Sequence, residues 1–253
     1  MNEQYSVISQ YYELLNSGMD YEAYADFIDK IIKEKGIEKT ELVLDLACGT
    51  GKITRLLADR GYDMTGVDIS PEMLSVAREQ DYDDPKGILY LCQDMREFEL
   101  YGTVDAAVCC LDSINYLLKT ADVEKCFRLV HNYLVPDGIF IFDVNTPRRF
   151  TEEYAKHDYI LEEEGVLLAW QNYYNEKNKT CDFVLSFFEE QQDGSYERYD
   201  EIQREKIFSM RTLKSLISKC GFELLDIYSD LDFSVNIDKS DKWFFVCRCE
   251  KQG

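Results

Sequence analysis

The feature that most constrains this chain is an apolar stretch that ends in an acid and a glycine turn near residue 50. The stretch reads Val43-Leu44-Asp45-Leu46-Ala47-Cys48-Gly49-Thr50-Gly51. Gly49 and Gly51 permit positive φ and let the backbone approach a ligand with no Cβ in the way. The unpaired N–H groups of the helix that follows can bind an anionic group such as a carboxylate. The junction between strand and helix therefore predicts a cofactor site.

A second strand carries another acid toward the same crevice. Seventeen residues after Gly51, the strand 64–67 ends in Asp68, and Ser70-Pro71-Glu72 then starts a helix as N-cap, first residue and first-turn acid. Asp68 can accept two hydrogen bonds from a ribose diol. Asp45 is itself an anion and is not needed for the carboxylate of the ligand. We therefore expect it to bind an ammonium group or to order the loop. A ligand with ammonium, carboxylate and ribose groups fits S-adenosylmethionine better than a dinucleotide.

A dinucleotide site is the alternative interpretation of this junction. Its phosphate-binding pattern, G-x-G-x-x-G, needs a third glycine, and that position is Thr54. The pattern also lacks an acid two residues before its turn, whereas Asp45 leads directly into the glycines. A lone G-x-G pair can be a purely structural turn. Its combination with Asp45 and Asp68 favours a cofactor site.

The same residues resemble the first motif of the class I S-adenosylmethionine-dependent methyltransferases, D/E-x-G-x-G-x-G. Asp45, Gly49 and Gly51 match it, and Ala47 stands where the first glycine usually is. The resemblance covers about residues 40–150 and continues through three later segments: 66–74, 93–96 and 134–138, the last leading into the strand 139–144. Outside that span, three more segments resemble a subgroup of small bacterial methyltransferases: 11–15, 112–117 and 196–201.

This resemblance implies S-adenosyl-L-methionine as the cofactor and assigns residues to its site. Asp94 resembles the acid that follows the third strand in this family, so it is expected to accept a hydrogen bond from the adenine amino group. The expected cofactor residues are Tyr12, Asp45, Ala47, Cys48, Gly49, Gly51, Asp68, Ile69, Met73, Gln93, Asp94, Met95 and Leu111.

The order of the predicted elements indicates an α/β fold. Strands alternate with helices up to about residue 144, which implies right-handed crossovers and a parallel sheet. The pattern then changes to three strand-like stretches, 159–172, 180–191 and 195–208, with turns at 175–178 and 192–194. We therefore predict a Rossmann-like class I methyltransferase sheet, mostly parallel with an antiparallel last strand, plus an antiparallel β insert. The cofactor-binding domain is expected at 1–149 and 209–253, and the insert at 150–208.

The insert is expected to act as a lid or a substrate-binding region. It leaves the sheet after the fifth strand, at the carboxyl edge where ligands of open α/β sheets lie. Methyl transfer needs mainly positioning and exclusion of water, so no dedicated catalytic base is required. Candidates for contact with the methyl acceptor are Asp112, Asn115 and Tyr116 after the fourth strand, and Trp170, Tyr199 and Arg204 in the insert. A capped loop for the first three and core packing for the last three are the structural alternatives.

Tyrosines and cysteines also have both functional and structural interpretations. Tyr5, Tyr11 and Tyr12 can close over the cofactor, where a ring face attracts the sulfonium charge, or can serve helix packing. The nine cysteines form no C-x-x-C pair, which indicates reduced, buried thiols beside the strands. Cys48 and Cys110 are accordingly expected to be small core residues and not nucleophiles.

Composition excludes several partners. With 28 basic and 49 acidic residues, the net charge of −21 repels nucleic acid and anionic membrane surfaces. No metal site is expected, because the chain has two histidines and no clustered ligand spacing. The first thirty residues lack the apolar core of a signal peptide, so we expect a cytoplasmic protein. The sequence leaves the oligomeric state open.

Together these patterns predict a methyltransferase that acts on a nitrogen or oxygen atom of a small molecule. Two alternatives stay open at this point. A noncatalytic regulator would keep the glycine turn and Asp68 but would need no acceptor pocket, and a nucleotide-dependent oxidoreductase would need the missing third glycine.

Overall fold

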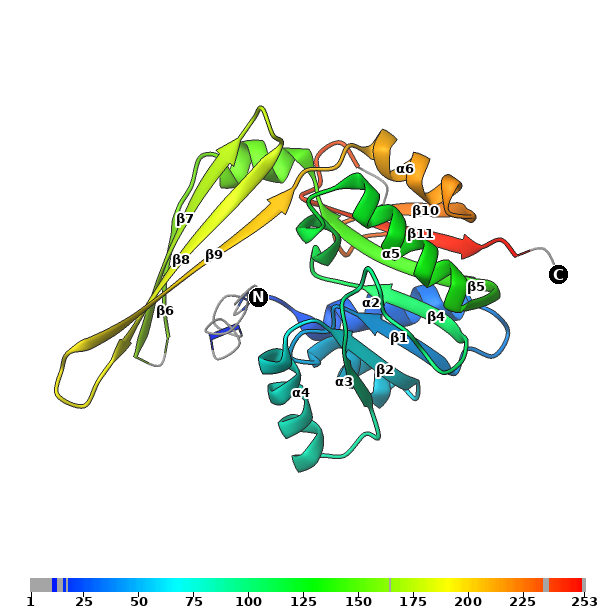
Figure 1. The fold of residues 1–253 in the computed structure, drawn as a ribbon, viewed down its shortest axis with the longest axis horizontal. Coiled ribbons are helices and arrows are strands. Elements are labelled where there is room, and N and C mark those ends of the chain that lie inside the picture. The colour runs from blue at the N-terminus through cyan, green and yellow to red at the C-terminus, as the bar shows by residue number, and fades with distance from the viewer. Residues whose placement is uncertain (1–10, 13–15, 17, 164, 234–236, 252–253) are drawn as a thin grey trace.

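The larger part of the molecule is a seven-stranded sheet (Figure 1). The computed structural model describes residues 11, 12, 16, 18–163, 165–233 and 237–251. The strands of this sheet are β1 (Leu42–Leu46), β2 (Asp63–Asp68), β3 (Leu89–Cys92), β4 (Val104–Cys109), β5 (Leu134–Asn145), β10 (Phe222–Ser229) and β11 (Lys242–Cys249). They lie in the order β10-β11-β5-β4-β1-β2-β3, with β1 to β5 parallel and β11 antiparallel to both of its neighbours. The predicted mostly parallel sheet with an antiparallel last strand is confirmed.

Helices cover both faces of this sheet. On one face lie α2 (Tyr21–Lys35) and α3 (Lys52–Asp59), on the other lie α5 (Thr120–Tyr133) and α6 (Met210–Lys219), and α4 (Pro71–Asp83) packs against β2 and β3. Along β5, Ile139 and Ile141 join the core under α2 and α3, whereas Phe140 and Phe142 join the core under α5 and α6. Burial on both faces explains why the central strands are almost continuously apolar.

The strand order creates a switch point between β1 and β4. The chain runs outward from β1 through β2 to β3 and then crosses back to β4 on the other side of β1. A crevice forms beyond the carboxyl ends of the strands at such a switch. The glycine turn after β1 and the loops after β2 and β4 therefore meet at one place.

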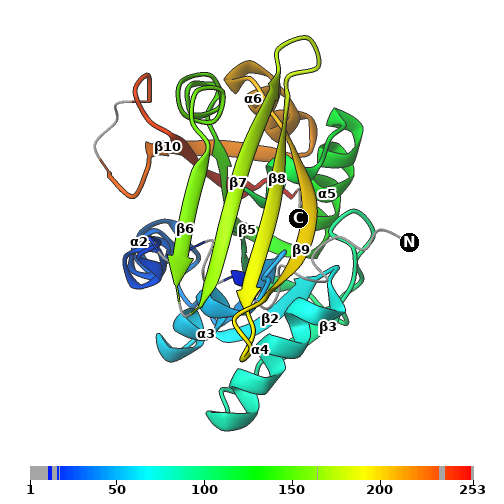
Figure 2. The same ribbon diagram turned by 90° about the vertical axis from the view of Figure 1, so that its left-hand side faces the viewer.

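A second sheet of four antiparallel strands stands beside the first, and Figure 2 shows it face on. Its strands are β6 (Tyr159–Glu163), β7 (Val166–Asn175), β8 (Thr180–Glu190) and β9 (Tyr196–Lys206). The predicted insert and both of its predicted turns are present. The prediction of one strand over 159–172 is wrong, because the chain reverses within it: Gly165 adopts φ +81°, and Glu163 pairs with Val166. The residues on both sides of this tight turn are typical of strands, so the sequence pattern predicted one continuous strand.

Two short helical turns, which the sequence analysis did not predict, connect these parts. η1 (Ser113–Tyr116) follows β4, and η2 (Arg149–Tyr154), a single π-helical turn, leads from β5 into the second sheet. One side of the second sheet is apolar and packs with Phe150 and Tyr154 of η2. Tyr11 joins this cluster, since its ring stacks on that of Phe187 at 5.0 Å. The insert therefore has a core of its own, which also includes Met73 of α4.

The nine cysteines are all free thiols. The expectation of burial holds for most of them, but Cys92 at the end of β3 is exposed and Cys48 is half-buried. Burial raises the pKa of both Cys48 and Cys110 well above its usual range. Neither sulfur is therefore a thiolate at neutral pH, which agrees with a packing role.

Gly66 of β2 lies so close to a tyrosine ring that no side chain fits there. A Cβ at this position would lie 2.8 Å from Cδ1 of Tyr90 and 2.9 Å from Sγ of Cys48. The ring of Tyr90 in turn reaches Gly51, where a Cβ would lie 2.5 Å from the tyrosine oxygen. The absence of a side chain at both glycines thus lets the ring of Tyr90 pack directly against the turn after β1.

We predict that Gly66→Ala lowers the free energy of unfolding by about 1–3 kcal/mol, because the added methyl overpacks this contact. Urea denaturation of both proteins measures the difference. Gly102→Ala is the matched control, since its Cβ would meet nothing within 4 Å. Equal stabilities of the two variants would contradict the proposed packing.

Candidate active site

A cavity of about 840 Å³ lies between the carboxyl edge of the main sheet and the apolar side of the second sheet. Its volume is within the range of small-molecule sites. Of the residues that the sequence predicts to be functional, fourteen line this cavity: Tyr12, Ala47, Gly49, Asp68, Ile69, Met73, Gln93, Asp94, Met95, Leu111, Asp112, Tyr116, Trp170 and Arg204. The fold thus brings residues from across the chain into one site.

Asp68 joins the two loops on one side of the cavity. Its Oδ2 accepts a hydrogen bond from the amide of Gly49 at 2.8 Å, and its Oδ1 accepts one from the amide of Ser70 at 2.8 Å. Burial raises the pKa of Asp68, and these amide bonds act in the opposite direction. Ser70 caps α4 as predicted, with Oγ accepting from the amide of Met73 at 3.1 Å. The carboxylate is thereby held rigidly at the end of β2, with lone pairs left for a ligand.

Asp45 lies beneath the turn and not in the large cavity. Its Oδ2 accepts a hydrogen bond from Oγ1 of Thr54 at 2.6 Å, and the side chain is buried. Burial is the main cause that raises the pKa of Asp45 to about 7. Thr54 occupies the position where a dinucleotide pattern needs its third glycine. Of the two roles expected for Asp45, the ordering of the loop is the one for which the structure contains the contact.

Cys48 and Gly51 also lie behind the cavity wall. Cys48 borders a small neighbouring void together with Asp45, and Gly51 starts α3 in the left-handed conformation with φ 77°. Contact of these residues with the cofactor was expected, but only the turn residues Ala47 and Gly49 line the large cavity.

Asp94 lies on the wall beyond β3. Its carboxylate accepts hydrogen bonds from the backbone amide of Arg96 at 2.8 Å and from the guanidinium of the same residue. Partial burial acts against ionisation, but the contact with Arg96 lowers the pKa of Asp94 below its usual value. Gln93 uses its side-chain amide to hold the backbone of Glu99, with Oε1 accepting at 2.6 Å. Both side chains are thus fixed before any ligand arrives.

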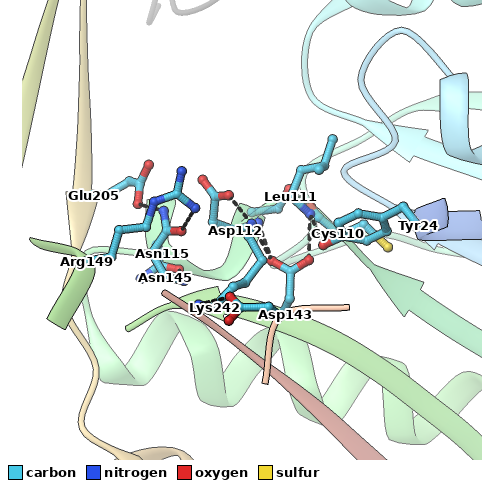
Figure 3. A network of polar contacts seen from close by, with 12 residues as sticks. Tyr24, Cys110, Leu111, Asp112, Asn115, Asp143, Asn145, Arg149, Glu205 and Lys242 are labelled. Atoms are coloured by element: carbon cyan, nitrogen blue, oxygen red, sulfur yellow. Dashed lines mark hydrogen bonds and ion pairs between the residues drawn. The ribbon is translucent and has the colours of Figure 1, made fainter. Parts of the chain in front are cut away.

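The loop after β4 forms the opposite wall, and a buried cation holds it. Leu111 and Asp112 both adopt φ near +55°, and their amides donate to the carboxylate of Asp143 at 2.9 and 2.5 Å. Nζ of Lys242 lies 2.6 Å from Oδ1 of Asp112 and 3.3 Å from Oδ1 of Asp143 (Figure 3). Burial alone would lower the pKa of Lys242, but the two carboxylates outweigh it and raise that pKa. Although burial opposes it, the ion pair keeps the pKa of Asp112 low.

Asn115 is not a cavity residue. It is fully buried, its Nδ2 donates to the carbonyl of Lys206 at 2.8 Å, and its Oδ1 accepts from the amide of Asn145 at 3.0 Å. These bonds join β5 to β9. In the structure Asn115 therefore connects two strands and does not face the cavity. Tyr116 does line the cavity, and its hydroxyl donates to Oε1 of Gln203 at 2.7 Å.

The three insert candidates differ in their surroundings. Trp170 lines the cavity, and its ring meets that of Phe183 edge-on at 5.7 Å. Arg204 also borders the cavity, but its guanidinium pairs with Asp182, with Nη2 2.6 Å from Oδ2. Tyr199 does not line the cavity and lies in the apolar cluster of the insert. For Tyr199 the structure therefore shows the core-packing alternative.

The tyrosines near the start of the chain also separate. Tyr12 lines the cavity, whereas Tyr11 packs against the insert and donates to Oε2 of Glu189 at 3.0 Å. Tyr5 lies outside the described residues. Of the two tyrosines among these that the structure describes, Tyr12 is the one that lines the cavity.

Seven charged residues that line the cavity were not among the predicted site residues: Glu72, Arg96, Lys119, Asp122, Arg149, Glu205 and Lys242. Asn145 links two of them, because its Nδ2 donates to Oε2 of Glu205 at 3.0 Å and its Oδ1 accepts from Nη1 of Arg149 at 3.0 Å (Figure 3). Burial and the charge of Asp112 raise the pKa of Glu205 well above its usual range. The one available sequence signal was the polar stripe Glu201, Gln203, Glu205, whose spacing of two places it on one side of β9.

Comparison with known proteins identifies the class to which this site belongs. Residues 43–138 match a methyltransferase domain family. The chain belongs to the class I S-adenosylmethionine-dependent methyltransferases, enzymes that transfer a methyl group from this cofactor. Over 98% of its length and 98% of the relative's, it is 33% identical to YqeM of Bacillus subtilis (strain 168), which is named as a candidate methyltransferase.

Two further matches support the class. The crystal structure of an S-adenosylmethionine-dependent methyltransferase from Clostridium acetobutylicum ATCC 824 superposes with a TM-score of 0.85 at 26% identity, covering 95% of this chain and 96% of that one. A Streptomyces fradiae dTDP-3-amino-3,6-dideoxy-alpha-D-glucopyranose N,N-dimethyltransferase is 30% identical over 58% of this chain and 57% of its own length. The chain is thus an enzyme of this class, and a regulator or an oxidoreductase is not supported.

The described residues contain neither a membrane-spanning helix nor a metal-binding cluster. None of the helices described is long and apolar enough to cross a membrane. Within the same part of the chain, no group of three or more His, Cys, Asp or Glu side chains could hold a metal ion.

Asp45 predicts a pH-dependent stability. Its pKa is higher in the folded than in the unfolded chain, so its contribution is complete below about pH 4 and is lost as the pH rises to about 7. Relative to Asp45→Asn, the free energy of unfolding of the parent protein should fall by about 2–3 kcal/mol between pH 5 and pH 7.

Urea denaturation at each pH measures this difference. Asp63→Asn, an exposed acid at the start of β2, is the control for the loss of one carboxylate. Parallel pH profiles for Asp45→Asn and the parent protein would contradict the assignment.

Proposed function

We propose that this enzyme methylates the nitrogen of a small-molecule amine. The observation that carries the proposal is the carboxylate of Asp112, which lines the cavity and is held ionised by Lys242. The N,N-dimethyltransferase from Streptomyces fradiae, named for an amino sugar, supports nitrogen as the acceptor atom. The cavity is large enough for the cofactor and a small acceptor together.

The cofactor is proposed to occupy the side of the cavity formed by the glycine turn and the loops after β2 and β3. Bound S-adenosylmethionine supplies an electrophilic methyl group on a sulfonium. Asp68 would hold the ribose hydroxyls, since it lines the cavity and retains lone pairs. The exposed backbone at Ala47 and Gly49 would bind the methionine carboxylate, and Asp94 would bind the adenine amino group. Tyr12 would lie beside the sulfonium, where an aromatic face is favourable.

The acceptor is proposed to lie against Asp112. An amine attacks as the neutral base, becomes a cation as the C–N bond forms and the C–S bond breaks, and then releases a proton. A nearby carboxylate stabilises the developing positive charge and can accept that proton. A hydroxyl acceptor would have to give up its proton earlier, and a carboxylate with a low pKa is a weak base for that purpose. The charge arrangement therefore favours nitrogen over oxygen.

The insert, about residues 150–208, is proposed to shape the acceptor half of the cavity. Trp170, Phe183 and Leu185 give this wall flat apolar surfaces. The glycine turn, Asp68 and Asp94, which are proposed to hold the cofactor, all precede residue 100. The insert is thus placed to choose the acceptor and to exclude water, with little effect on cofactor affinity.

We predict that S-adenosylhomocysteine binds and that Asp68→Ala weakens its binding by about 1.5–3 kcal/mol, because a charged acceptor for the ribose is lost. Isothermal titration calorimetry measures both affinities. Asp63→Ala, at the other end of β2, should bind as the parent does. An unchanged affinity of Asp68→Ala would refute this role.

The proposed reaction is tested by labelled methyl transfer to a panel of primary and secondary amines and to the matched alcohols. We expect product from amines, and Asp112→Asn should lower turnover about a hundredfold through loss of the carboxylate charge. Its affinity for S-adenosylhomocysteine should stay within about twofold. The control is Asp83→Asn on the exposed side of α4. Methylation of alcohols alone, or full activity of Asp112→Asn, would contradict the proposal.

A further inference from the structure

Arg149 is a cavity cation for which no direct ion pair is seen among the described residues, although the charge of Asp112 acts on it from a longer range. It is half-buried at the start of η2, and its guanidinium makes one hydrogen bond, from Nη1 to the amide oxygen of Asn145. The ring of Tyr154 lies 5.2 Å from its Cζ. Within the described part of the chain, no carboxylate lies within 4.0 Å of this guanidinium. Arg148, the next residue along the chain, pairs with Asp241 and does not line the cavity.

The neighbouring acids are already committed to other contacts. Asp112 and Asp143 share Lys242. Glu205 accepts a hydrogen bond from Nδ2 of Asn145 at 3.0 Å, and burial together with the charge of Asp112 raises its pKa well above the usual range. A guanidinium has five N–H donors, and the single neutral bond to Asn145 leaves most of them available. These free N–H donors face the cavity, where they are available to an anionic group of a ligand.

We propose that Arg149 binds an anionic group of the methyl acceptor, so that the acceptor is an amine that also carries a carboxylate or a phosphate. The planar fork of the guanidinium matches both groups, which it can bind through two parallel hydrogen bonds. This inference rests on the proposed function, since the amine is assigned to Asp112.

The arrangement of charges supports a substrate with both signs. The ends of Arg149, Asp112 and Glu205 lie around the same space, above Asn145 (Figure 3). An amine at Asp112 would thus place an attached anion within the reach of Arg149. The net charge of −21 repels anions at long range, so an anionic acceptor needs a local cation of this kind.

The test titrates acetate and, separately, inorganic phosphate into protein saturated with S-adenosylhomocysteine. Tryptophan fluorescence reports binding, because Trp170 lines the same cavity. We expect saturable binding of at least one anion, and the stronger of the two identifies its chemistry. Arg149→Met should weaken that binding about tenfold or more, and Arg149→Lys, which keeps the charge but not the fork, should weaken it less.

Arg148→Met is the matched control and should bind the anion as the parent does. Equal anion binding by Arg149→Met and the parent, or no saturable binding by the parent, would overturn the inference. Loss of S-adenosylhomocysteine affinity in both Arg149 variants would also overturn it, because Arg149 would then hold the cofactor.

The outcome is separable from that of the proposed function. Anion binding through Arg149 in an enzyme that methylates only alcohols would overturn the choice of an amine while leaving the anion site. Methylation of amines with no dependence on Arg149 would overturn the anion site alone.

Discussion

The active-site wall depends on one buried cation, Lys242, which comes from the last strand of the sheet. It neutralises Asp143, and Asp143 accepts the amides of Leu111 and Asp112, which hold the loop after β4 in a left-handed conformation. Buried charges are tolerated only when each has a partner. Removal of Lys242 would leave Asp143 without its ion-pair partner and would release the strained loop. A residue at the end of the chain thus fixes the position of a proposed substrate contact.

The site is formed by two sheets that bury their apolar surfaces in different ways. The parallel sheet is covered on both faces and presents only its carboxyl edge, where Asp68 and the glycine turn lie. The antiparallel sheet buries one side, and part of that side lines the cavity. Hydrogen bonds of Asn115 and Asn145 join the two sheets at the carboxyl end of β9. The rigid edge suits an invariant cofactor, and the separate sheet can vary with the acceptor.

Much of the cofactor side could be predicted from the sequence, because its residues follow strand ends at fixed offsets. Asp68, Gln93 and Asp94 line the cavity as expected. The acceptor side was predicted less well. Asn115 and Tyr199 were expected to face a substrate but do not line the cavity, while Arg149 and Glu205 line it and were not expected. Arg149 lies on an irregular π-helical turn, which leaves no periodic signal.

The sequence by itself determined the family, the cofactor and the alternation of strands and helices, because these depend on local patterns: an apolar run, a glycine turn and an acid at a strand end. It also determined that an antiparallel insert follows the fifth strand. Only the tertiary structure decided which charged and polar side chains contact one another. Lys242 and Asp112 are 130 residues apart, and Asn145 and Glu205 are 60 apart. Such pairings arise from the packing of one sheet against another, and the short-range spacing of residues does not encode them.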